Sequence, residues 1–159
     1  MFNIGEFVVH PLHGAGVIDA IVQGRISGST QEYYVFKMPM GGLMLKIPTA
    51  NSQAIGIRSM ITPEEAEALI AAIPALEAEN SANWNKRYQE NLDRLKSGDL
   101  YQVARVIKSL MTRESRRGLS TGERKMLHSA KQILISEIVL TQKADYQEVE
   151  ARIDRAVAK

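Results

Sequence analysis

The hydrophobic pattern changes once along this chain, and that change limits which folds it can form. Residues 1–58 contain short runs of β-branched and aromatic residues at 7–10, 15–22, 32–38 and 43–47, separated by glycine and proline. A weaker run at 53–57 is compatible with a fifth strand. Five short strands joined by tight turns, including those at 24–30 and 39–42, predict a small, strongly bent antiparallel barrel. Such a module usually keeps an open edge to which a partner's strand can pair.

After residue 58 the apolar residues recur at helical spacing. Thr62, Pro63 and Glu65 predict a helix start, because threonine can cap, proline fits the first position and glutamate can close a capping box. Further helix starts are predicted at Ser81 or Asn83, Asp99, Ser120 and Asp145.

These patterns predict the fold class α+β, in three parts. A β domain spans 1–58, a helix and linker span 59–82, and a compact all-α domain spans 83–159. Within the middle part, residues 74–82 combine proline, alanine and polar residues and are interpreted as the linker.

The positive charge is concentrated in one stretch of the helical half. Residues 81–131 carry twelve Lys/Arg and five Asp/Glu, a net charge of +7, whereas the whole chain carries only +2. A solvated helical surface would explain many such runs, but this local excess favours a polyanion such as nucleic acid as the partner.

Trp84 is the single tryptophan, and it stands at the entrance of a predicted helix next to Lys86 and Arg87. Tyr88, Leu92 and Leu95 continue that helix as one apolar stripe. The indole is therefore either a buried anchor of the core or an aromatic wedge that projects among cations.

Several kinds of chemistry have no support in the sequence. The chain has no cysteine, which excludes disulfides, thiolate catalysis and cysteine-ligated metals and fits a cytoplasmic protein. No apolar run reaches the length of a membrane helix. His10, His13 and His128 lack the spacing of a metal site, so structural or surface roles are favoured. No phosphate-binding loop or nucleophile motif is present, and we expect neither an enzyme nor a small-molecule substrate.

A set of short motifs resembles the CarD/CdnL family of bacterial transcription regulators over residues 2–143. They are FVVHPLHG at 7–14, EY at 32–33, NW at 83–84, RY at 87–88, NL at 91–92, SGD at 97–99, RGLS at 117–120, GERKML at 122–127 and AKQIL at 130–134. The first motif is also shared with the polymerase-binding module of transcription-repair coupling factors. The tryptophan motif and the RGLS–GER motif together are specific.

The resemblance implies a Tudor-like amino-terminal domain that binds the β subunit of RNA polymerase. It also implies a helical domain that contacts promoter DNA at the upstream edge of the transcription bubble. By position, Trp84 would be the wedge at the minor groove. DNA contacts would come from Lys86, Arg87, Arg117, Arg124 and Lys125, and polymerase contacts from Arg25 and Lys46.

We therefore expect a cofactor-free, nucleoid-associated regulator that stabilises the open promoter complex. The alternative is a nucleoid-type structural protein that binds DNA without polymerase. An RNA-binding module is disfavoured, because the β half is nearly neutral and the cations lie on the helices.

Overall fold

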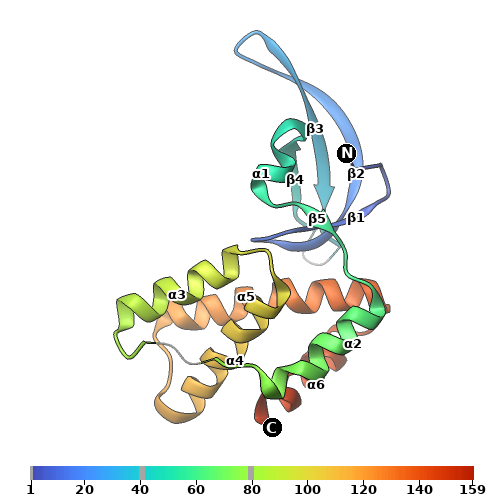
Figure 1. The fold of residues 1–159 in the computed structure, drawn as a ribbon. Coiled ribbons are helices and arrows are strands. Elements are labelled where there is room, and N and C mark those ends of the chain that lie inside the picture. The colour runs from blue at the N-terminus through green and yellow to red at the C-terminus, as the bar shows by residue number, and fades with distance from the viewer. Residues whose placement is uncertain (1, 40–41, 79–80) are drawn as a thin grey trace. The chain divides into compact units, whose positions relative to one another are not determined.

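The computed structural model describes residues 2–39, 42–78 and 81–159, whose contacts divide the chain into two units. Unit 1 ends at Met60 and contains the β-strands, and unit 2 spans Ile61–Lys159 and contains the long helices (Figure 1). This order confirms the predicted α+β class, with the β half first and the helical half second. Among the described residues, no helix is both long and apolar enough to span a membrane.

Unit 1 is built on one five-stranded antiparallel sheet. Its strands are β1 (Phe7–His10), β2 (Gly14–Ile26), β3 (Ser29–Lys37), β4 (Met44–Pro48) and β5 (Arg58–Ser59). Their order in the sheet is β4-β3-β2-β1-β5, which leaves β4 and β5 at the edges. The side chains that form its core are Val8, Ile18, Tyr34, Phe36, Met38, Ile47 and Ile57.

The hairpin of β2 and β3 is longer than the sequence indicated (Figure 1). Ser27 and Gly28 form its two-residue turn, with φ angles of 51° and 80° that match the turn type preferred in hairpins. Gly24, which was assigned to the loop, instead pairs with Gln31 inside the ladder. The predicted turn at 39–42 lies partly outside the described residues.

The predicted strand at 53–57 is wrong. A 3-10 turn, η1 (Thr49–Asn51), leads into the short helix α1 (Ser52–Ile55) at this place. Gly56 ends α1 in the left-handed conformation, with a φ of 96°, and Ile57 then enters the core. The fifth strand, β5, follows and pairs with β1.

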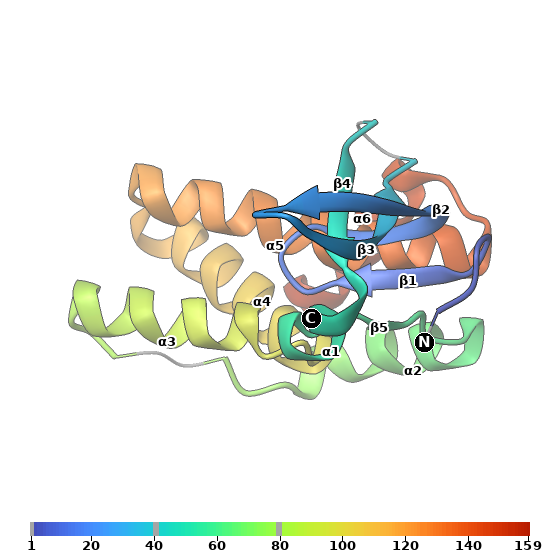
Figure 2. The same ribbon diagram turned by 90° about the horizontal axis from the view of Figure 1, so that it is seen from above.

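Unit 2 is a bundle of helices packed around α5. Its elements are α2 (Pro63–Ala72), η2 (Ile73–Ala75), α3 (Trp84–Lys96), α4 (Leu100–Arg117), α5 (Thr121–Gln142) and α6 (Tyr146–Ala158). Helix α5 (Figure 2) contacts α2, α3, α4 and α6. Residues 133–138 in its middle are buried. The predicted caps at Thr62, Asn83, Asp99, Ser120 and Asp145 all accept backbone hydrogen bonds.

The segment 59–82 does not form a separate connecting part between two domains. Helix α2 belongs to unit 2, because Ala66, Leu69 and Ile70 are buried in the helical core. Residues 76–78 and 81–83 connect η2 to α3, and the remaining two residues of the predicted linker lie outside the described residues.

The first residue of unit 2 is fixed to α5 by both of its backbone groups. The N–H of Ile61 donates to Glu137 Oε2 at 2.8 Å, and its carbonyl accepts from Thr141 Oγ1 at 2.7 Å. Glu137 has no exposed surface, so its carboxylate accepts this hydrogen bond away from solvent. A single residue, Met60, separates this attachment from β5.

Candidate nucleic-acid interface

The amino termini of α3 and α5 lie next to each other. Asn83 caps α3 by accepting from the N–H of Lys86 at 3.1 Å, and Ser120 caps α5 by accepting from the N–H of Glu123 at 3.2 Å. The Glu123 carboxylate accepts in return from the N–H of Ser120, which completes a capping box. Two helix ends with positive dipole charge therefore face one small region.

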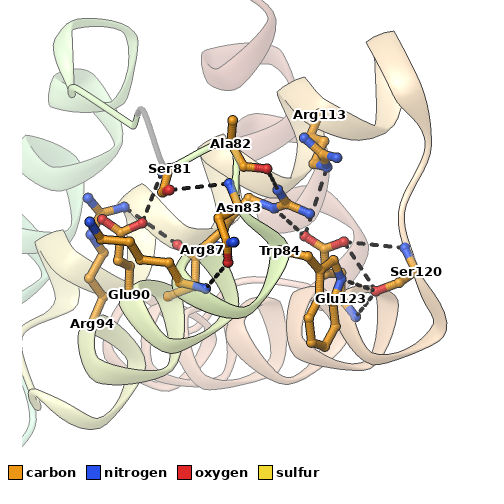
Figure 3. Close-up of polar contacts among 12 residues, drawn as sticks. Ser81, Ala82, Asn83, Trp84, Arg87, Glu90, Arg94, Arg113, Ser120 and Glu123 are labelled. Carbon is orange, nitrogen blue, oxygen red and sulfur yellow. Dashed lines mark hydrogen bonds and ion pairs between the residues drawn. The ribbon is translucent and has the colours of Figure 1, made fainter.

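Trp84, the first residue of α3, bridges these two helix ends (Figure 3). Its indole Nε1–H donates to Ser120 Oγ at 3.3 Å, and its ring stacks on Tyr88 with centroids 5.1 Å apart and an interplanar angle of 16°. The side chain nevertheless stays 44% exposed. The ring is thus held in one orientation while much of it remains accessible. Of the two interpretations that the sequence left open, the buried anchor does not apply to Trp84.

Arg87, a DNA contact according to the resemblance, is buried in this structure. Only 4% of the residue is exposed, because its Nε donates to Glu123 Oε2 at 3.0 Å and its Nη1 donates to the carbonyl of Ala82 at 3.2 Å (Figure 3). The expectation of a surface arginine ready to contact phosphate is therefore corrected. In this structure Arg87 joins α3 to α5.

Glu123 is a buried carboxylate that stays ionised. Burial alone would raise its pKa, but hydrogen bonds from Arg87 and Ser120, together with the charge of Arg87, lower that pKa below its ordinary value. Arg113 adds a second cation, with Nε 4.0 Å from Glu123 Oε2. Successive hydrogen bonds consequently link the exposed ring to a fixed ion pair, in the order Trp84, Ser120, Glu123 and Arg87.

The other predicted DNA contacts are exposed. Lys86 lies on the first turn of α3, Arg124 and Lys125 on the first turns of α5, and Arg117 at the end of α4. None of the four has an ion-pair partner within the described part of the chain. Three of them flank the helix ends that Trp84 bridges.

Two further cations of the basic stretch have structural partners that the sequence did not reveal. Lys108 Nζ donates to the carbonyls of Ile73, Pro74 and Leu76 at 2.8–2.9 Å and so closes the end of η2. Lys131 forms ion pairs with residues of α6. Both partner sets lie far away in sequence, so no local signal identifies them.

The two residues predicted to contact polymerase are exposed on unit 1. Lys46 lies on the edge strand β4, opposite Val35 of β3, and Arg25 lies on β2, opposite Thr30 near the hairpin turn. Among the described residues, no strand pairs with the outer side of β4. The edge anticipated from the sequence is therefore present on unit 1.

The histidines do not form a metal site within the described residues. His10 is buried, and its Nδ1 accepts from the N–H of Leu12 at 3.0 Å. Burial, and secondarily the neighbouring His13, lowers the pKa of His10 to about 4. His10 is consequently a neutral structural residue, as the sequence favoured.

Both units match known protein families. Residues 2–61, in unit 1, match the CarD-like/TRCF RID domain. Residues 68–154, in unit 2, match the CarD C-terminal domain. The chain belongs to the CarD family. It is 33% identical over 138 residues to the putative transcription factor YdeB of Bacillus subtilis. The aligned region covers 87% of this chain and 90% of YdeB.

Proposed function

We propose that this chain is a transcription regulator that binds the β subunit of RNA polymerase through unit 1 and promoter DNA through unit 2. In this role it stabilises the open promoter complex at the upstream edge of the bubble. Membership of the CarD family and the likeness to YdeB, a putative transcription factor by name, support regulation of transcription.

The half-exposed, oriented ring of Trp84 carries the DNA part of the proposal. An aromatic wedge that enters a partly unstacked base step holds DNA bent or open, at a cost of a few kcal/mol that the contacts repay. The ring needs a fixed orientation, which Tyr88 and Ser120 supply, and an exposed surface, which it has.

The cations around the ring fit contacts to phosphates. Lys86, Arg124 and Lys125 are exposed and surround two helix amino termini, whose free N–H groups also attract anions. Phosphate contacts position a protein on DNA without reading its sequence. Promoter choice would then come from polymerase, which holds the regulator at the right DNA and raises its effective concentration there.

Unit 1 supplies the polymerase part through its free edge. Strand β4 can pair with a partner's strand through backbone groups, and Met44, 53% exposed, lies beside Lys46 on it. An apolar side chain next to a cation is suited to contact with a protein. Unit 1 is nearly neutral, so its charge does not favour nucleic acid as the partner.

The lifetime of an open promoter complex tests the wedge. Trp84→Ala should shorten this lifetime about tenfold, the scale of a lost aromatic contact with DNA, while polymerase binding stays unchanged. Tyr101→Ala is the matched control, because Tyr101 is a similarly exposed aromatic residue, 42% exposed, on α4. An unchanged lifetime with a folded, polymerase-bound Trp84→Ala variant would contradict the assignment.

Polymerase capture separates this function from a nucleoid-type protein. Lys46→Glu should weaken capture of purified polymerase and leave binding to free duplex unchanged. Arg155→Glu on α6 of unit 2, also exposed, is the charge-matched control. If the unmodified chain binds DNA but fails to capture polymerase, the nucleoid-type alternative is favoured.

A further inference from the structure

A concave basic surface lies beside α4, and its lining includes two of the residues expected to contact DNA, Arg87 and Arg117. It has a volume of about 500 Å³, within the range of roughly 300–1,000 Å³ found for small-ligand sites. Its described lining includes Arg87, Lys108, Arg113, Arg116 and Arg117 and contains no acidic residue. We call it the basic pocket.

The spacing along α4 explains why these groups converge. Residues 108, 109, 112, 113 and 116 all line the basic pocket. On a helix these positions, i, i+1, i+4, i+5 and i+8, share one face. The wall of the pocket formed by α4 therefore combines cationic side chains with Ser109 and Thr112.

The cations of the pocket differ in how far the fold already uses them. Lys108 is bound by three carbonyls and Arg87 by Glu123 and Ala82, so both are committed to structure. Arg116 and Arg117 are exposed and have no ion-pair partner within the described residues.

Arg113 is the most informative member. Its Nε is buried and has no hydrogen-bond partner, since the 4.0 Å approach to Glu123 is too long for one. A buried donor without an acceptor costs free energy. The rest of the Arg113 side chain is 30% exposed and lines the pocket, where it can contact an anionic ligand.

We propose that the basic pocket binds phosphate groups, supplied either by the DNA backbone or by a free polyphosphate such as a nucleoside triphosphate. Guanidinium groups form paired hydrogen bonds with phosphate oxygens, and several of them together match the charge of a phosphate chain. The pocket lies at the carboxyl end of α4, where the helix dipole disfavours anions. Binding there depends on side chains alone, and the DNA source rests on the function proposed above.

The test uses the full-length chain labelled with nitrogen-15 and follows the Nε–H signals of its arginines by NMR. Inorganic tripolyphosphate and a short DNA duplex are added in separate titrations. Either ligand should shift the Arg113 signal. Arg116→Gln should weaken binding of tripolyphosphate about tenfold, the scale of one lost charged hydrogen bond. Because Arg116 is exposed, this variant leaves the fold intact.

Arg155→Gln on α6 is the control, since it removes the same charge from an exposed position outside the pocket. A shift with the duplex alone identifies the DNA backbone as the source, and a shift with tripolyphosphate alone identifies a free polyphosphate. No shift of Arg113 with either ligand overturns the proposal, as does equal weakening by Arg155→Gln and Arg116→Gln. The open-complex test with Trp84→Ala can succeed in all these cases, so the two proposals fail separately.

Discussion

Arg87 and Glu123, 36 residues apart in sequence, form a buried ion pair with Nε and Oε2 3.0 Å apart. The pair joins the first turn of α3 to the first turn of α5. Because Glu123 also closes the capping box with Ser120, and Ser120 accepts from Trp84, the position of the exposed indole depends on this pair.

Removing one partner of the pair should destabilise unit 2 strongly. Arg87→Met leaves the Glu123 carboxylate buried without its main partner, and such losses cost about 3–5 kcal/mol. The double variant Arg87→Met/Glu123→Gln removes the orphaned charge and should recover part of that loss. Urea unfolding followed by tryptophan fluorescence measures both, since Trp84 is the single tryptophan.

The same pair makes unit 2 sensitive to acid. The folded pKa of Glu123 lies below its ordinary value of 4.5, so its contribution to stability is present above that value and is lost as the pH falls through the lowered pKa. Glu123→Gln should remove this part of the acid dependence. A stability difference between the two proteins that does not change below pH 4.5 would contradict the assignment.

Ser120 has two roles that a matched pair of variants can separate. Ser120→Ala and Thr62→Ala each break a capping box and should each cost about 1 kcal/mol. Only Ser120→Ala also removes the acceptor of the Trp84 N–H. We therefore expect lower fluorescence anisotropy of the indole and a shorter open-complex lifetime for Ser120→Ala alone. Equal behaviour of the two variants would show that the hydrogen bond does not orient the ring.

His10 should make unit 1 less stable in mild acid. Its pKa of about 4 in the folded protein lies below the ordinary 6.5, so the unfolded chain binds the proton more tightly between these values. Stability is thus complete above pH 6.5 and declines towards pH 4, by at most about 3 kcal/mol.

His10→Asn tests this dependence, because asparagine keeps an acceptor for the N–H of Leu12 and does not titrate. The stability of unit 1, followed by its own NMR signals, should then stay level between pH 6.5 and pH 4.5. The control is His128→Asn, since His128 is exposed on α5. A similar decline in His10→Asn and in the unmodified protein would rule out His10 as its cause.

Local signals in the sequence predicted helix starts better than strand positions. Thr62 and Ser120 act within four residues, so their capping boxes are readable from sequence and are confirmed. The run at 53–57 is short and apolar, which suits a strand or a helix equally, and the left-handed Gly56 decides for α1. A length of five residues did not distinguish the two.

Long-range pairing explains what was missed at the candidate site. The exposed position of Trp84 fits its cationic neighbours in sequence, whereas the burial of Arg87 depends on Glu123, and the use of Lys108 depends on carbonyls of η2. Likewise, α2 was separated from the bundle because Pro74 suggested a boundary, although its apolar face completes the helical core. A single sequence shows which residues are cations but not which of them find partners.

The attachment of Ile61 to α5 leaves little unrestrained chain between the two units. With β5 fixed in the sheet and Ile61 held at both backbone groups, Met60 is the only residue between them without such restraint. One extended residue spans at most about 3.6 Å, so the chain provides no slack that could be drawn out. Under the proposed function, polymerase binding by unit 1 and DNA contact by unit 2 would therefore be coupled through this single unrestrained residue.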